Sequence, residues 1–436
     1  MVRTFACLSM ISLAVGWVAT GCSNDEATTC TVCSCDSTDA GVDAPADADA
    51  GELDGGGPDA SVPPPGPFRV IAQVGPEELA GTLGTIRPSV AVDGSGQPHV
   101  VINDGDDLAV PNVYLYHRIG AQWQGGLLAQ ANAFHPSTTI IETPHIEIDP
   151  LGRAWISAHL FQANVEDACG QAVFLIDDVA TAPTLSWQQR FYVNWGFGHL
   201  ATDPHHPDQG VVMSRDGAYQ IVSDTGAVVD SGQMFIGQSG EKLRLRIHPR
   251  SGQEGVWHGV MGGWTQDSSS YQNSLRHAEG FEPVTWADYT CYPGQGDDRK
   301  HPSVGIDAVD PDVAYIASRY NPGVVINVWN GSEMIYPTCS LQVIEPSTTN
   351  HGNGCDRFGP QWTPARGGGA FLCWTTSDSK IRMTYVHPGG FIDGPVDVAE
   401  GRACTMATDA AGSVHLVYAR DGVRYRKLET EPVALP

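Results

Sequence analysis

The chain of 436 residues is strongly acidic, with 50 Asp and Glu against 24 Lys and Arg and a formal net charge of −26. Nucleic-acid binding depends on basic patches that neutralise phosphates, so this charge argues against a nucleic-acid partner. A hydrophobic fraction of 41% can supply a globular core. Beyond the N-terminal segment, no stretch is apolar enough to cross a membrane.

Residues 1–21 have the features of an export signal. Arg3 supplies positive charge, Phe5–Ala19 is apolar but short, and Cys22 follows Gly21. A small residue directly before Cys resembles the lipobox of bacterial lipoproteins, in which that Cys is acylated. The resemblance implies lipidation at Cys22, membrane association through the lipid alone, and residence in the cell envelope, at the outer membrane or cell surface. The alternative is an ordinary secretory signal and a secreted protein.

Residues 22–66 form a tether rather than a domain. Residues 23–66 contain ten acidic side chains and no Lys or Arg, and are otherwise mostly Ala, Gly, Pro, Ser and Thr. Such a segment cannot bury enough apolar surface to fold, so we expect a flexible acidic linker. Without the tether and Arg3 the remaining chain still has 40 acidic against 23 basic residues.

Residues 67–436 repeat one motif, in which a half-apolar run ends at an Asp, a turn follows, and a second apolar run returns. The clearest copies are Pro88–Val101, Pro144–Ile156 and Thr405–Tyr418. Each copy predicts a β-hairpin, because alternating apolar residues around a Gly-containing turn are typical of paired strands. The seven copies are anchored at Asp93, Asp149, Asp203, His248, Asp307, the degraded Gln361–Pro364 and Asp409.

The spacing of these copies predicts the fold class. A period of about 53 residues is slightly long for a four-stranded propeller blade and too long for most solenoids. Val113–Arg118 and Val423–Leu428 supply third strands, and Phe68–Val74 is a natural fourth strand for the last blade. We therefore predict an all-β, seven-bladed β-propeller over residues 67–436, closed by its N-terminal strand and acting as a monomer. An open pair of β-sandwiches or two smaller propellers are the alternatives.

The cysteines agree with an exported protein. Apart from Cys7 and Cys22, three lie in the tether and six in the repeat region. Six cysteines in an exported domain allow up to three disulfides. Sequence proximity alone favours Cys339 with Cys355 and Cys373 with Cys404. The tether cysteines could bind metal or form one local disulfide with a spare thiol.

Chemically useful residues recur at one place in the repeat. Side chains alternate along a strand, so positions four and six before the anchor should face the same way, near one mouth of the central channel. They include several cations and imidazoles, namely Arg87, His145, His199, Arg244 and His301. The ends of the second strands add His159, Arg319 and Tyr320, and the Gly-rich loop at 260–271 adds Trp264. Together they predict a site for an anionic ligand; the alternative is a set of solvated or backbone-bonded side chains at the blade rims.

The motif Pro144–Ile156 resembles the repeats of exported sialidase-like (BNR-type) propeller proteins, in particular propeller polysaccharide lyases of the ulvan lyase kind. The resemblance implies β-elimination of a uronic-acid polysaccharide, with His and Tyr as base and acid and Arg near the carboxylate. Applied here, it gives His145 or His199 the base role, Tyr320 the acid role, and Arg244 and Arg319 the substrate carboxylate. We expect no cofactor, although a structural metal ion stays open.

Other functions remain in competition. A non-catalytic surface propeller that binds glycans or proteins would need exposed aromatic residues at equivalent positions around the blades. A sialidase-type hydrolase would need paired carboxylates or a Tyr–Glu nucleophile; Glu142 and Glu147 lie near His145, but neither pairs recognisably. No nucleophile elbow, phosphate loop or HExxH motif is present.

Overall fold

The computed structural model describes sixteen segments of the chain. They are residues 71–81, 87–104, 112–138, 140–161, 170–191, 199–214, 217–234, 240–248, 256–263, 270–277, 280–287, 300–320, 323–332, 359–376, 378–390 and 392–431. The export signal, Cys22, the tether and Trp264 lie outside them. Within these segments the secondary structure is β-strands and one 3₁₀ turn, Ala131–Ala133, with no helix long and apolar enough to cross a membrane.

The described strands form seven antiparallel sheets. Three sheets come first in the chain: β3 (Ser89–Val92), β4 (Pro98–Asn103), β5 (Asn112–Ile119) and β6 (Gln122–Gln130); β7 (Ile140–Ile148), β8 (Ala154–Phe161), β9 (Gly170–Asp177) and β10 (Thr184–Phe191); and β11 (His199–Thr202), β12 (Gln209–Met213), β13 (Ala218–Ser223) and β14 (Val228–Gln233).

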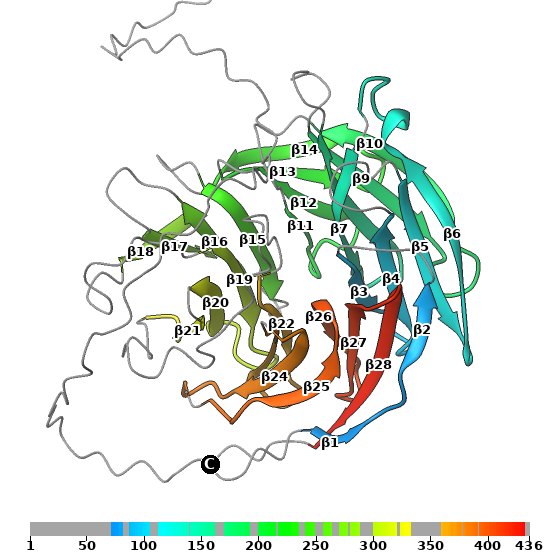
Figure 1. Cartoon of the computed structure of the whole chain (residues 1–436). Coiled ribbons are helices and arrows are strands. Elements are labelled where there is room, and N and C mark those ends of the chain that lie inside the picture. The colour runs from blue at the N-terminus through cyan, green and yellow to red at the C-terminus, as the bar shows by residue number, and fades with distance from the viewer. Residues whose placement is uncertain are drawn as a thin grey trace, which may run out of the picture.

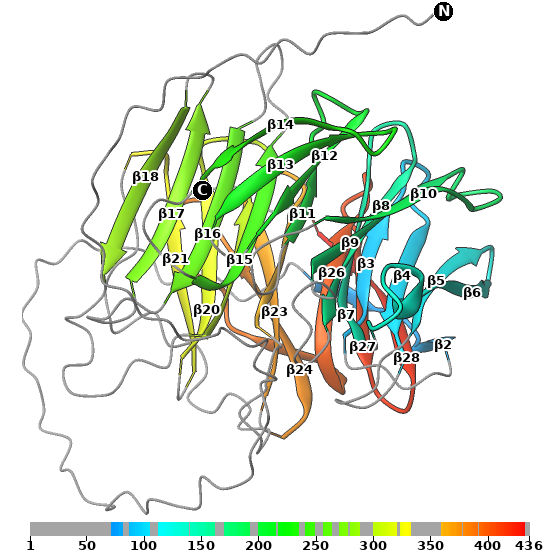
Figure 2. The same cartoon turned by 90° about the horizontal axis from the view of Figure 1, so that it is seen from above.

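The other four sheets follow in chain order: β15 (Gly240–His248), β16 (Val256–Gly263), β17 (Ser270–His277) and β18 (Gly280–Ala287); β19 (Lys300–Ile306), β20 (Ala314–Tyr320) and β21 (Gly323–Trp329); β22 (Gln361–Pro364), β23 (Ala370–Thr375), β24 (Lys380–Val386) and β25 (Val396–Glu400); and β26 (Arg402–Thr408), β27 (Val414–Ala419) and β28 (Val423–Thr430), with β1 (Ile71–Val74) and β2 (Glu78–Gly81) paired to β28. Figure 2 shows β15–β18 side by side as one such sheet.

The sheets are arranged around a common centre, with the first strand of each innermost (Figure 1). Each first strand lies beside the first strand of the next sheet, from β3 through β7, β11, β15, β19 and β22 to β26, and β26 lies beside β3. This arrangement is a β-propeller, so the prediction of an all-β propeller is confirmed.

The anchoring Asp has a structural role that explains why the motif repeats. In the first copy, Asp93 Oδ1 accepts the backbone N–H groups of Ser95 and Gln97, both at 2.9 Å, and Asp93 Oδ2 lies 3.0 Å from His99 Nε2. The carboxylate therefore holds the turn and ties it to the second strand. A hydrogen bond to a charged group contributes about 1.5–3 kcal/mol. In three other copies the anchoring carboxylate is also hydrogen-bonded to a side chain of the second strand: Asp149 to Trp155, Asp307 to Tyr315 and Asp409 to His415.

Aromatic side chains fill the spaces between neighbouring sheets. The ring of Trp155, fully buried in β8, packs against Gly210 of β12, where an added Cβ would lie 2.7 Å from the ring atom Cε3. Trp362 of β22 packs in the same way against Gly305 of β19. Neighbouring sheets approach so closely at these two glycines that neither position has room for a side chain. Most tryptophans of the described residues therefore belong to the core.

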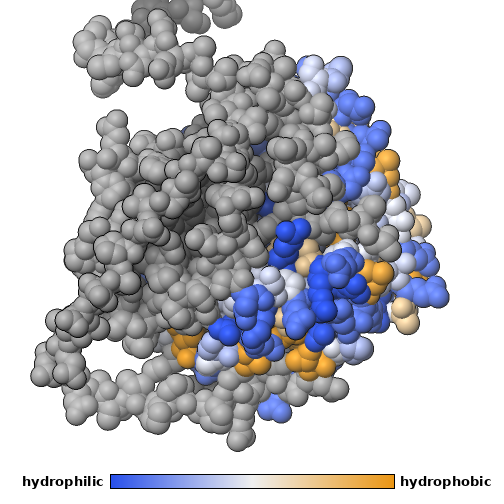
Figure 3. Space-filling view, in the orientation of Figure 1, coloured by the Kyte–Doolittle hydropathy of each residue, from blue (hydrophilic) through white to orange (hydrophobic). Residues whose placement is uncertain are grey.

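The N-terminal segment lies along the last strand of the chain. Val74 of β1 and Glu78 of β2 pair with Leu428 and Tyr425 of β28. Arg118 donates two hydrogen bonds to the Glu78 carboxylate, at 2.9 and 2.8 Å. The surface over β2 and β28 is mostly hydrophilic (Figure 3). The predicted strand Phe68–Val74 thus corresponds to β1 from Ile71 onward, and Phe68–Val70 lie outside the described residues.

One predicted disulfide is present. Cys373 of β23 and Cys404 of β26 are bonded, with their Cα atoms 6.4 Å apart. The bond joins two neighbouring sheets of the ring. The other proposed pair, Cys339 and Cys355, falls outside the described part of the chain.

Candidate functional site

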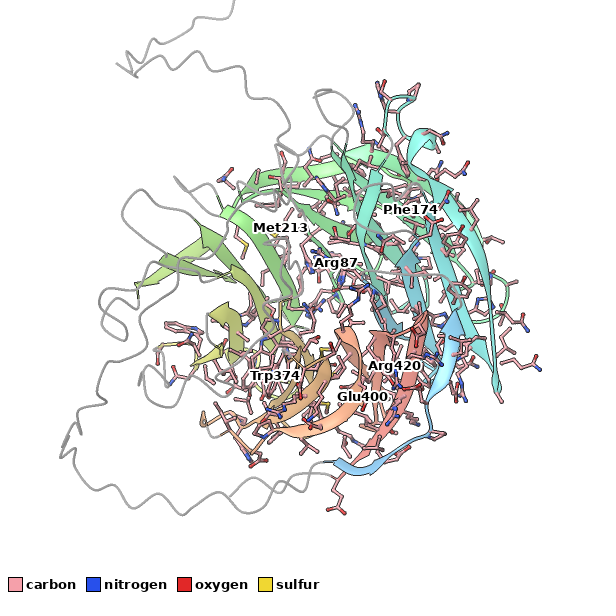
Figure 4. All side chains as sticks on the ribbon, in the orientation of Figure 1. Arg87, Phe174, Met213, Trp374, Glu400 and Arg420 are labelled. Carbon is pink, nitrogen blue, oxygen red and sulfur yellow. A yellow bond between two sulfur atoms is a disulfide. The ribbon has the colours of Figure 1, made fainter. Side chains whose placement is uncertain are left out.

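The innermost strands enclose a central cavity of about 320 Å³. All seven first strands contribute to its lining, and Arg87, just before β3, points to the middle of the ring (Figure 4). A cavity of this size lies at the lower end of the range for small-molecule sites. Of the residues predicted for the site, Arg87, His145 and His199 line this cavity.

The two sides of this cavity differ in chemistry. We call the lining residues of β3, β7, β11 and β15, together with Arg87, the charged wall, and those of β19, β22 and β26 the neutral wall. The polar residues of the charged wall are Arg87, Ser89, Thr143, His145, Glu147, His199, Thr202 and Arg246. Among the described side chains of the neutral wall none carries a formal charge, and Ile306, Trp362, Thr363, Met406 and Thr408 are typical of it.

His145 is at the centre of the charged wall. Its Nε2 lies 3.2 Å from Glu147 Oε1, and its Nδ1 lies 3.4 Å from Ser89 Oγ. Its side chain is about one-fifth exposed, at 20%. Ser89 and His145 come from neighbouring strands, whereas His145 and Glu147 share β7, where residues two apart face the same side.

Glu147 is the most heavily bonded group of the site. Its Oε2 accepts hydrogen bonds from the Thr202 backbone N–H at 2.7 Å and from Thr202 Oγ1 at 3.0 Å. Its Oε1 also accepts from Arg246 Nη1. Burial alone would raise the pKa of Glu147, but Arg246 and the hydrogen bonds from His145 and Thr202 outweigh it and hold that pKa below its usual range. Glu147 is therefore an ionised acceptor.

His199 is a nearly buried member of the charged wall. Its ring centroid lies 4.4 Å from that of His145, with the two rings tilted by 35°. Its Nδ1 accepts the backbone N–H of Leu245 at 3.3 Å, and only 3% of the residue is exposed. Because a substrate can reach it less easily, His199 is a poorer candidate for a general base than the more exposed His145.

A local irregularity corrects one expectation. Glu142 and His145 of β7 pair with His159 and Ser157 of β8, so the two residues between them on β7 oppose one residue of β8. The same shift occurs between Lys300 and Ser303 and between Arg402 and Thr405. This is a β-bulge, and it reverses the alternation of side chains.

The bulge falls at the position six residues before the anchor. Thr143 and Ala403 there have φ of 51° and 58°, the left-handed region that side chains rarely adopt. The regular alternation from which positions four and six before the anchor were grouped is therefore interrupted in β7, β19 and β26, although Thr143 and Ala403 still line the cavity. In these strands the residue seven before the anchor aligns with the one four before it. His301 lies inside the bulge of β19.

The remaining predicted residues fall elsewhere or are only partly described. His159 is buried in β8, 6% exposed, and is not among the residues lining the cavity. Arg244 is in β15, and Arg319 and Tyr320 end β20. The side chains of these three residues, and that of His301, lie outside the described part of the structure.

Sequence reasoning missed two members of the charged wall. Glu147 and Arg246 both stand two residues before their anchors, Asp149 and His248, and both line the cavity. Their equivalent positions in the repeat could have drawn attention to them. The ion pair between them, however, joins β7 to β15 across the intervening β11, and two strands that are not adjacent can make such a contact only because the sheets curve around the channel.

The described residues hold no group of three or more His, Cys, Asp or Glu side chains arranged to bind a metal ion. Comparison with family models and curated proteins does not identify the site. No family model matches the chain, and no curated protein matches its sequence. The fold and the cavity define the class only as a β-propeller with a polar central channel.

Proposed function

We propose that this protein cleaves an anionic, uronate-containing polysaccharide by β-elimination in the central channel, with His145 as the base. The observation that carries the proposal is the hydrogen bond between His145 Nε2 and the ionised Glu147, in a cavity that also holds Arg87. An ionised carboxylate only accepts, so neutral His145 has its proton on Nε2 and its lone pair on Nδ1.

The chemistry uses that lone pair. His145 Nδ1 takes the proton from the carbon beside the uronate carboxylate, and the resulting enolate charge is stabilised by nearby cations. Arg87 and Arg246 are the described cations on the cavity wall, and Arg246 is already paired with Glu147. Arg244 and Arg319 are assigned to the carboxylate through the family resemblance. The glycosidic C–O bond then breaks as Tyr320 protonates the leaving oxygen, leaving a carbon–carbon double bond in the sugar ring.

The test is the ultraviolet absorbance of the unsaturated uronate product, followed while the mature chain is incubated with a panel of uronate-containing polysaccharides. We expect a rise that His145→Ala abolishes and that His206→Ala, in an exposed turn, leaves unchanged. Absence of a rise across the panel would sink the lyase assignment. Retained glycan binding in that case would favour a non-catalytic binding propeller.

We also propose that the seven sheets are seven blades of one ring, closed by the N-terminal strands on β28, and that the domain is attached to the bacterial envelope through lipidated Cys22. The tether of residues 22–66 would hold the channel away from the membrane. Support comes from the strand pairing and from the small residue that precedes Cys22. In a bacterial host, Cys22→Ser should release the protein from the membrane fraction and remove incorporation of labelled fatty acid; continued labelling would contradict it.

A further inference from the structure

Ser89, His145 and Glu147 form a chain of hydrogen bonds along the charged wall. Ser89 Oγ lies 3.4 Å from His145 Nδ1, and His145 Nε2 lies 3.2 Å from Glu147 Oε1. All three residues line the same cavity. From this geometry we propose a second activity, hydrolysis of a short-chain carboxylic ester, with Ser89 as the nucleophile. This activity goes beyond the proposed function, because β-elimination needs no nucleophile.

The hydrogen bonds fix the direction of proton transfer. Ser89 Oγ accepts the backbone N–H of Ile146 at 3.3 Å, which occupies one of its lone pairs. Among the described residues, the other hydrogen-bond partner of the hydroxyl is His145 Nδ1, which bears the lone pair because Nε2–H donates to Glu147. Ser89 therefore donates its proton to the imidazole. A serine hydroxyl hydrogen-bonded to a histidine whose other nitrogen donates to a carboxylate is the arrangement that activates a nucleophile.

The carboxylate is held firmly enough to orient the imidazole. Thr202 donates to Glu147 through both its backbone N–H and its hydroxyl, and Arg246 donates to the other carboxylate oxygen. These bonds come from β11 and β15, so two neighbouring sheets position a group of β7. A constellation supported in this way by rigid strands retains its geometry when substrate binds.

The reaction balances without any further reagent. The Ser89 Oγ–H bond breaks, its proton passes to His145 Nδ1, and Oγ bonds to the ester carbonyl carbon. The alcohol then leaves with the proton from His145, giving an acyl-serine. Water, deprotonated by the same nitrogen, releases the carboxylic acid and restores Ser89. Arg87, two residues before Ser89 and lining the same cavity, is the described cation for the negative oxygen that develops.

The cavity restricts the substrate. Its volume of about 320 Å³ matches a small acyl group and part of an alcohol. The neutral wall includes Ile306, whose side chain can contact the apolar part of such a group. The substrate class is thus a short-chain ester, such as an acetyl ester of a hydroxyl group.

Labelling of the serine provides the test. The mature chain is treated with a fluorophosphonate probe, and the modified residue is identified by peptide mass spectrometry. We expect modification at Ser89 that is lost in Ser89→Ala and His145→Ala and retained in Ser137→Ala, an exposed serine. Hydrolysis of a chromogenic acetyl ester should fall by roughly 10³-fold or more in Ser89→Ala.

A second variant distinguishes loss of the nucleophile from misfolding of the chain. Ser89→Cys should lose fluorophosphonate labelling and gain labelling at position 89 by a thiol-selective alkylating probe. No modification of Ser89 in a folded wild-type chain, or ester hydrolysis unchanged in Ser89→Ala, overturns the proposal. Neither the labelling assay nor the ester assay contains a uronate, so each can succeed or fail independently of the lyase test.

Discussion

The charged and neutral walls of the channel are built on the same strand motif but differ in what holds them together. On the charged wall, Glu147 connects three sheets through hydrogen bonds and an ion pair with Arg246. On the neutral wall, the corresponding links are the Cys373–Cys404 disulfide and a hydrogen bond between Thr363 and Thr408 at 3.0 Å. A propeller is stable only if all neighbouring sheets are held together. Here the charged hydrogen-bonding groups lie on one side of the channel, while the links named on the other side are a disulfide and an uncharged hydrogen bond.

Loss of the covalent link should have the largest effect on stability. Cysteines 31 residues apart close a loop whose cross-linking typically contributes about 2–4 kcal/mol. We expect the double variant Cys373→Ala/Cys404→Ala to lower the free energy of unfolding by about 3 kcal/mol, measured by chemical denaturation in the absence of reductant. Reductant should destabilise the wild-type chain in the same direction and leave the variant unaffected. Equal stability of variant and wild type would show that the neutral wall does not depend on the bond.

Removal of the central carboxylate should be the next largest effect. Glu147→Ala leaves Arg246 and the Thr202 N–H without their acceptor in a site where the Glu147 side chain is 15% exposed. We expect a loss of about 2–3 kcal/mol, since stranding one partner of a mostly buried pair is costly. The matched change on the neutral wall, Thr363→Val, should cost only about 1 kcal/mol because both partners are uncharged. Similar losses for the two variants, measured by denaturation, would remove the distinction between the walls.

Packing between sheets should be equally tight on both sides. Gly210→Ala and Gly305→Ala each place a Cβ 2.7 Å from an atom of a buried tryptophan. Each should destabilise by about 1–3 kcal/mol through overpacking, with a lower melting temperature as the readout. Gly126→Ala is the control, since nothing lies within 4 Å of its added Cβ. If only one of the two tight glycines were sensitive, the walls would differ in packing as well as in charge.

The smallest expected effect is a dependence of stability on pH at the anchors. Burial, only partly opposed by Asp93, lowers the pKa of His99, and burial also lowers that of His117. A histidine whose folded-state pKa is depressed takes up protons more readily when unfolded, so stability falls as pH drops below about 6.5. Asp307 uses Tyr315 in place of a histidine and lacks this dependence.

Thermal unfolding between about pH 7.5 and pH 5 measures this effect. His99→Gln should flatten the dependence of the melting temperature on pH, while His206→Gln, on an exposed turn, should not change it. The lowered pKa of Asp93 adds a further loss of stability at more acid pH, where that carboxylate becomes protonated. A variant His99→Gln with an unchanged pH profile would show that the anchor histidine does not titrate with unfolding.

Much of the fold could be predicted because the hairpin motif is local. The turn at Asp93 and the return strand at His99 are joined by hydrogen bonds within seven residues, so the pattern of Asp, turn and apolar run is readable in the sequence. The pairing of Cys373 with Cys404 was predicted from proximity alone and is present. The site was predicted less well. His145 and Arg87 do line the cavity, but the bulge at Thr143 reversed the alternation on which the rest of the prediction depended.

The sequence by itself determined the all-β class, the repeated hairpins and the presence of His145 near the channel, because each depends on residues close together in the chain. Only the tertiary structure decided which side chains meet there. Ser89, His145, Thr202 and Arg246 come from four different strands, and their contacts with one another and with Glu147 arise from the curvature of the ring. The hydrogen bonds from Thr202 and Arg246 that hold Glu147 beside His145 cross between sheets, and no spacing within one repeat encodes them.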